Sequence, residues 1–160
     1  NPLEGWNILT NILETDGIMK IGLYSKFARQ ELLEFKRKID SKYKLKNVKD
    51  VKELRHKIIN DNLIKLPKIF NFIDFFSISG FKDLLLNENE IQFNLIQIKE
   101  ILSELNLRFC GFQIMDDNIK NKAIKNDEKF DNYNLSDWHY FEEKNHLTFQ
   151  GMYQFWCQKL

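Results

Sequence analysis

The sequence predicts an α/β fold, in which short buried strands alternate with amphipathic helices. The first indication is the short apolar run Ile18–Leu23, which the turn signal Asp16-Gly17 precedes and the polar pair Tyr24-Ser25 follows. The second is that apolar residues recur at helical spacing on both sides of this run. The third is a pair of further short apolar runs, Leu107–Ile114 and Met152–Gln158. Because α/β sheets place their sites at the carboxyl ends of strands, a site is expected just after the first run.

The amino-terminal residues are predicted to form a helix, a tight turn and a strand. Pro2 suits the first turn of a helix, and apolar residues continue at helical spacing from Leu3 to Glu14. The strand Gly17–Tyr24 is rich in apolar residues and bounded by turn signals. It is therefore expected to be buried on both faces of the sheet.

The middle of the chain is predicted to be mainly helical. Apolar spacing indicates helices at Lys26–Asp40 and Val48–Asn60, joined by a lysine-rich connection. The stretch Leu63–Leu86 contains five phenylalanines, which are more often core residues than a stacking platform. Two short helices are expected in this stretch, the first starting at Pro67 and the second resuming at Phe81 after a polar break.

The carboxyl-terminal part is predicted to alternate helices and strands. Its expected elements are an extended segment at Gln92–Asn94, a helix at Ile96–Leu105, the strand Leu107–Ile114, a polar helix from Met115 to Lys125, a loop at Asn126–Asn134, a helix that Ser136 caps, and the strand Met152–Gln158.

Composition indicates one folded domain. The chain has 160 residues, 43% of them hydrophobic, and a formal net charge of +1, which argues neither for nor against nucleic acid. The charge is uneven, with 15 Lys and Arg against 6 Asp and Glu from Lys20 to Lys68. From Glu88 to Asn145 the balance reverses, with 12 acidic and 7 basic residues. Such runs usually mark solvated helix faces, but a basic surface could also attract an anionic partner.

The two cysteines, Cys110 and Cys157, both lie in apolar runs and form no paired motif. They are interpreted as buried thiols in a reducing compartment, so a cytoplasmic location is expected. No stretch approaches the ~20 apolar residues of a membrane span, and no membrane association is expected. The start at Asn1-Pro2, without Met, suggests a piece of a longer protein.

The motifs of common catalytic and cofactor sites are absent from the sequence. The three histidines lie on separate predicted elements without metal-ligand spacing. There is no GxSxG, GxGxxG or P-loop pattern. No catalytic, metal-binding or cofactor-binding residue is therefore predicted.

Two groups of polar residues are candidates for a substrate pocket at one edge of the sheet. The candidates follow the first predicted strand or surround the break in the aromatic stretch, and they are Tyr24, Ser25, Arg29, Asp74, Ser77 and Asp83. Each has a structural interpretation as well, and Ser25 could simply cap the helix that follows it.

Several segments of the sequence together resemble those of one known family. They are Asn1–Trp6, Gly17–Ser25, Ala28-Arg29, Asp74–Gly80, Asp83–Leu85, Leu107–Phe112, Trp138 with Phe141-Glu142, and Thr148–Trp156. They resemble the second half of class I S-adenosylmethionine-dependent methyltransferases, in the bacterial subgroup often fused to tetratricopeptide repeats.

The resemblance implies a partial Rossmann-like fold with a helical insert. The sheet of that family has seven strands, and the last one is antiparallel and inserted next to the fifth. Gly17–Tyr24 would be the fifth strand, Leu107–Ile114 the sixth and Met152–Gln158 the seventh, so that the spatial order is fifth, seventh, sixth. The domain parts would be 1–25, the insert 26–95, and 96–160.

The resemblance also implies a function for the parent protein, which would transfer a methyl group from S-adenosylmethionine to an unknown acceptor. The family's cofactor-binding motifs would precede Asn1. This piece is therefore expected to bind no cofactor, to be inactive alone and to need the missing amino-terminal half as its partner. The alternative is a non-enzymatic interaction domain whose basic helices, Lys36 to Lys57, bind an acidic protein or, less expectedly, nucleic acid.

Overall fold

The computed structural model describes residues 2–43, 45, 47–60, 72–87, 90–113, 117–127 and 129–160. The chain divides into two compact units. The sheet unit comprises Asn1–Arg29 and Ile91–Leu160, and the helical unit comprises Gln30–Glu90. The predicted helix start at Pro67 and the predicted start of the polar helix at Met115 lie outside the described residues.

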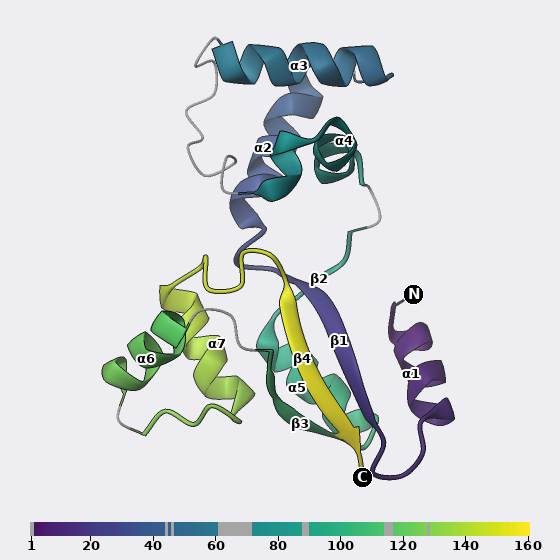
Figure 1. The fold of residues 1–160 in the computed structure, drawn as a ribbon, viewed down its shortest axis with the longest axis vertical. Helices are drawn as coiled ribbons and strands as arrows, with labels where there is room; N and C mark the ends of the chain where they lie inside the picture. The colour runs from purple at the N-terminus through teal and green to yellow at the C-terminus, as the bar shows by residue number, and fades with distance from the viewer. Residues whose placement is uncertain are drawn as a thin grey trace. The chain divides into compact units, whose positions relative to one another are not determined.

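The sheet unit has a mixed four-stranded sheet and α-helices (Figure 1). Its elements are α1 (Pro2–Ile12), β1 (Ile18–Ser25), β2 (Gln92–Phe93), α5 (Leu95–Glu104), β3 (Leu107–Phe112), α6 (Asp117–Asn126), α7 (Leu135–Lys144) and β4 (Tyr153–Lys159). The strand order is β2-β1-β4-β3. β4 lies antiparallel to both of its neighbours, and β2 adds a short parallel pairing to β1. The expected order of the three longer strands, with the last one antiparallel in the middle, is confirmed.

Local hydrogen bonds explain where several of these elements begin. Asp16, at φ 62°, makes the turn into β1, in a conformation that aspartate tolerates well. Asn94 begins α5 with a capping box, in which its side chain and that of Gln97 each bond the other's backbone N–H. The prediction that Ser136 caps the helix now labelled α7 is wrong. Asn134 caps it, because the Asn134 side-chain oxygen accepts a hydrogen bond from the Ser136 N–H.

The core of the sheet unit lies on one face of the sheet. The side chains of Tyr153, Phe155 and Cys157 alternate along β4 and are fully buried. Their partners across the pairing with β1 are Leu23, Ile21 and Met19, which pack against the same core. Helices α5 and α7 complete this core, and the ring of Trp6 from α1 lies 6.2 Å from that of Phe155.

The other face of β1 is exposed in the described chain. Ile18 is 61% exposed, Lys20 and Gly22 are exposed, and the neighbouring Trp156 of β4 is 40% exposed. The expectation that this strand is buried on both faces is therefore wrong. The reason is that the packed apolar side chains contact the face that carries Met19, Ile21 and Leu23.

One edge of β1 is also largely unpaired among the described strands. β4 pairs with Ile18–Leu23 along one edge, whereas β2 meets the opposite edge only at Tyr24 and Ser25. Helix α1 leaves apolar surface uncovered as well, since only Trp6 and Thr10 are buried in it. Its exposed apolar residues are Leu3, Ile8, Leu9 and Ile12.

The helical unit consists of α2 (Gln30–Lys42), α3 (Val48–Asn60), the short 3₁₀ helix η2 (Ile73–Phe76) and α4 (Ile78–Leu86). Three of the phenylalanines in its aromatic stretch, Phe72, Phe75 and Phe81, are buried, as the core interpretation predicted, but Phe76 is 62% exposed. The second short helix begins before Phe81, because the Ser77 hydroxyl accepts from the Gly80 N–H and caps α4. None of the helices that the structure describes is long and apolar enough to cross a bilayer.

Candidate functional site

Ser25 ends β1 and lies at the centre of a buried hydrogen-bond network. Its side chain is almost completely buried. The Ser25 hydroxyl donates to Glu142 Oε1 at 2.5 Å and accepts from the Ala28 N–H at 3.0 Å. The second bond closes the turn that leads out of the strand. The suggestion that Ser25 caps a helix is wrong, because no helix begins at this position. The predicted helix start at Lys26 is replaced by this turn, and α2 begins at Gln30.

Glu142 of α7 holds this network together. Its carboxylate accepts from Ser25 through one oxygen and from the Tyr153 hydroxyl through the other, the latter at 2.6 Å. The side chain has no exposed surface. A buried carboxylate must be bonded in this way, because an unpaired one would carry a large desolvation cost. The network thus ties the carboxyl end of β1 to α7 and to the first residue of β4.

Burial has the largest effect on the pKa values of this network. It raises the pKa of Glu142 to about 7, although the hydrogen bonds from Ser25 and Tyr153 partly lower that pKa. Burial also raises the pKa of Tyr153, and the neighbouring Glu142 carboxylate raises it further. Glu142 can therefore change its protonation state near neutral pH while Tyr153 remains a hydrogen-bond donor.

Tyr24 and Arg29 lie together beside the same strand end. The guanidinium carbon of Arg29 is 4.1 Å from the centre of the Tyr24 ring, which is the geometry of a cation–π contact. Arg29 is 4% exposed. The structure thus brings Tyr24, Ser25 and Arg29 to one place, as the sequence suggested for the end of the first strand.

The other three predicted pocket residues belong to the helical unit. Asp74, Ser77 and Asp83 are exposed, and their hydrogen bonds to other described residues join neighbours in the sequence. The backbone carbonyls of Asp74 and Asp83 accept from Ser77 and Asn87, while the Ser77 hydroxyl caps α4. These three residues are thus placed in a different unit from Tyr24, Ser25 and Arg29.

Glu142 and Tyr153 are site residues that the sequence analysis did not assign. The signal for Glu142 is its spacing, because it lies four residues after Trp138 and seven after Leu135, in phase with the buried face of α7. A carboxylate in an apolar stripe indicates a buried partner. Tyr153 gave no comparable signal, because a tyrosine in a buried strand is ordinary.

The described residues do not fit a metal or a nucleotide-like cofactor at this place. No group of three or more metal-ligating side chains occurs in the part of the chain that the structure describes. The turn after β1, Lys26–Arg29, contains no glycine that would let a backbone approach a ligand closely. Glu142 is already bonded through both of its oxygens. The arrangement therefore positions backbone and side chains rather than providing an exposed acid or base.

Comparisons with known proteins add no assignment to this geometry. No model of a known protein family matches the chain, and no curated protein matches it.

Proposed function

We propose that this chain is the carboxyl-terminal part of a class I S-adenosylmethionine-dependent methyltransferase with a partial Rossmann-like sheet and a helical insert. In this proposal the parent protein moves a methyl group from S-adenosylmethionine to an acceptor. The residues that hold the cofactor would lie outside this chain.

The observation that carries the proposal is the position of β4. This strand is the last in the sequence, yet it lies between β1 and β3 and runs antiparallel to both. The sequence segments that resemble the methyltransferase family imply this same insertion. Simple hairpin connections would instead place successive strands side by side. The match between the implied and the observed strand order therefore supports the proposal specifically.

The exposed edge of β1 supports the second part of the proposal, that a neighbouring half is required. Along Ile18–Leu23 no described strand occupies the edge away from β4. Long unpaired edges are uncommon in stable proteins because they pair with other chains. The exposed apolar residues Ile8, Leu9 and Ile12 of α1 add surface that a neighbouring half could cover.

The network around Ser25 has a positioning role in this proposal. Methyl transfer depends mainly on the distance and alignment between donor and acceptor, and a base is needed only if the acceptor must lose a proton. Glu142 fixes Ser25 and so holds the strand end at which Tyr24 and Arg29 would line the acceptor pocket. Asp74, Ser77 and Asp83 remain candidates for acceptor selection by the insert.

Calorimetry with S-adenosylmethionine tests the proposal. The 160-residue chain is expected to give no heat of binding, whereas a longer product of the same gene, extended upstream, is expected to bind in the micromolar range. A gene that encodes no upstream residues, or a longer product that does not bind, would contradict the proposal. Binding by the 160-residue chain alone would contradict the placement of the cofactor site.

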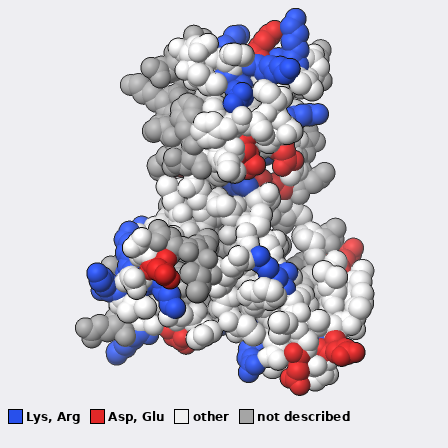
Figure 2. Space-filling view, viewed as in Figure 1, with Lys and Arg blue, Asp and Glu red and all other residues white. Residues whose placement is uncertain are grey.

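The alternative, an interaction domain that binds an acidic protein or nucleic acid, depends on α2 and α3. Figure 2 shows Lys and Arg side chains gathered over α3 on the visible face. One basic group of α2 and one of α3 are engaged within the helical unit, however. Lys36 donates to the Asn87 carbonyl, and Arg55 donates to the carbonyls of Phe75 and Phe76. The methyltransferase proposal is therefore the better supported.

A further inference from the structure

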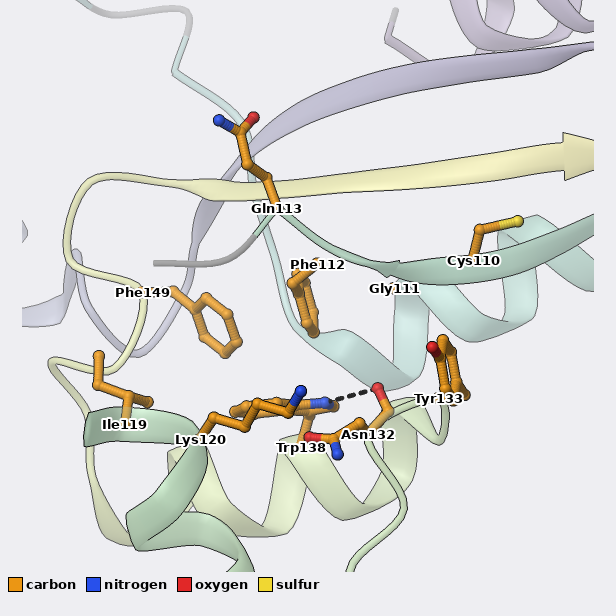
Figure 3. A pocket seen from close by; sticks show the side chains of 10 residues that line it. All are labelled: Cys110, Gly111, Phe112, Gln113, Ile119, Lys120, Asn132, Tyr133, Trp138 and Phe149. Atoms are coloured by element: carbon orange, nitrogen blue, oxygen red, sulfur yellow. Dashed lines mark hydrogen bonds between the residues drawn. The ribbon is translucent and has the colours of Figure 1, made fainter. Parts of the chain in front are cut away.

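The sheet unit contains a second feature, separate from the Ser25 network, at the carboxyl end of β3. It is a cavity of about 200 Å³, bounded by β3, α6, the start of α7 and the loops beside them (Figure 3). Phe112, Lys120, Asn132, Tyr133, Trp138 and Phe149 contribute to its walls.

Three aromatic rings make the apolar wall of this cavity. The Phe112 ring lies 4.6 Å from Phe149 and 5.5 Å from Trp138, and Trp138 and Phe149 are 5.8 Å apart, centre to centre. Phe149 and Trp138 are buried in the core of the unit, 1% and 6% exposed. Because the core fixes these rings, a ligand would meet a preformed surface and lose little affinity to reorganisation.

Polar groups line the cavity beside Trp138, and one of them carries a positive charge. Lys120 extends from α6 toward the middle of the cavity (Figure 3). It forms no ion pair or hydrogen bond with other described residues. Asn132 contributes a buried side-chain oxygen that also lacks a described partner. This oxygen accepts hydrogen bonds and so would not pair with an anion, which leaves Lys120 as the group that favours a negatively charged ligand.

The backbone at the rim has an unusual shape. β3 contains a bulge between Phe109 and Gly111, and Gly111 has φ 116°, which residues with a side chain rarely adopt. The Tyr133 ring lies beside Gly111, with its nearest atom 3.5 Å from where a Cβ would stand. The bulge thus lets an exposed ring close one side of the cavity.

We propose that this cavity binds a small planar aromatic carboxylate. The ring would lie against the half-buried Phe112 ring, which the buried rings of Trp138 and Phe149 hold in place, and the carboxylate would pair with Lys120. A cavity of about 150 Å³ can hold benzene in another protein, so the volume here suits one ring with a carboxylate. The proposal uses only β3, α6, α7 and their loops and does not depend on the methyltransferase assignment.

The test uses three probes of nearly equal size: benzoate, its neutral analogue benzamide, and the non-aromatic anion cyclohexanecarboxylate. Each is titrated into the ¹⁵N-labelled chain while the indole N–H signals of Trp6, Trp138 and Trp156 are recorded. The Trp138 N–H donates to the Asn132 carbonyl at the cavity wall, so its signal reports on the site. Benzoate is expected to shift this signal selectively, and to bind about tenfold more tightly than either analogue.

Variants with exposed side chains assign the contributions without disturbing the core. Lys120→Gln is expected to weaken benzoate binding about tenfold and to leave benzamide unchanged. Lys125→Gln, on the same helix but outside the cavity wall, is the matched control and should have no effect. Tyr133→Ala should weaken both aromatic probes, whereas Tyr140→Ala, an exposed tyrosine of α7, should not.

Three results would overturn the proposal. They are no selective shift of the Trp138 signal by benzoate at about 10 mM, equal effects of Lys120→Gln and Lys125→Gln, and equal binding of benzoate and cyclohexanecarboxylate. Preserved amide spectra of the variants show that a loss of binding does not come from unfolding.

Discussion

The hydroxyl of Ser25 donates to the carboxylate of Glu142 at 2.5 Å, across 117 residues of sequence. Both side chains are buried, and Tyr153 donates to the other oxygen of the same carboxylate. The bond therefore connects the end of the first long strand to a helix near the end of the chain. The strength of this bond depends on the protonation state of the Glu142 carboxyl group, so its contribution to stability can be measured as a function of pH.

The stability of the sheet unit is expected to fall as the pH rises from about 5 to 8. The pKa of Glu142 is about 7 in the folded chain against an ordinary value of 4.5. The folded state therefore binds the proton more tightly, and this contribution is fully present below the ordinary value and is lost as the pH rises through about 7. The loss is on the order of 3 kcal/mol at most. Urea unfolding followed by circular dichroism across this range measures it.

Glu142→Gln tests whether this carboxyl group is the source of the pH dependence. The amide cannot ionise, so the variant should lose most of the pH dependence and be more stable than the wild type at about pH 8. Glu104→Gln, at an exposed position of α5, is the control and should retain the wild-type slope. If Glu142→Gln and the wild type show the same slope, Glu142 does not titrate in this range.

Tyr153→Phe is expected to move the pH dependence to higher values. The hydrogen bond from Tyr153 lowers the pKa of Glu142, so its removal raises that pKa further. At about pH 8 the variant should lose roughly 1–3 kcal/mol, because an ionised buried carboxylate has lost a donor. The same urea titrations measure both effects, with Tyr140→Phe as the exposed control. An unchanged midpoint would show that the hydroxyl does not act on Glu142.

The arrangement of the strands could be predicted from the sequence to a useful extent. β1 and β4 lie within one residue of their predicted bounds and β3 begins at the predicted Leu107, because short apolar runs between turn signals are a strong local indication. The predicted end of the middle strand at Ile114 lies outside the described residues. Their order in the sheet came from the family resemblance and not from periodicity. The exposed face of β1 was not predicted, because Ile18 and Ile21 are equally apolar and only the packing distinguishes them.

The candidate site was predicted only in part, for a physical reason. Tyr24, Ser25 and Arg29 follow a strand directly, so local sequence places them together. Glu142 and Tyr153 reach the same place through tertiary packing of α7 and β4, which a single sequence does not specify. Buried networks of this kind join distant segments, and their members can be found from sequence only as polar residues in apolar patterns.

Gly111→Ala is expected to destabilise the sheet unit by about 1–3 kcal/mol. The positive φ of Gly111 at the bulge in β3 strains any residue with a Cβ. The matched control is Gly151→Ala, where an added Cβ meets nothing within 4 Å. The control should change the free energy of unfolding by less than about 0.5 kcal/mol. Equal effects of the two substitutions in urea unfolding would show that the bulge tolerates a side chain.

The 160-residue chain is expected to self-associate when it is made alone. The unpaired edge of β1 offers backbone groups to a second strand, and Ile18, 61% exposed, adds apolar surface beside it. Ile18→Lys places a charge next to this edge, which should reduce association without a loss of stability because the side chain is already exposed. Ile73→Lys, at an 83% exposed position of the helical unit, is the control for the general effect of an added charge. Sedimentation velocity over a range of concentrations should show larger species for the wild type and for Ile73→Lys than for Ile18→Lys. A wild-type chain that remains monomeric throughout would show that the edge is protected, and the inference of a missing neighbouring strand would lose its main support.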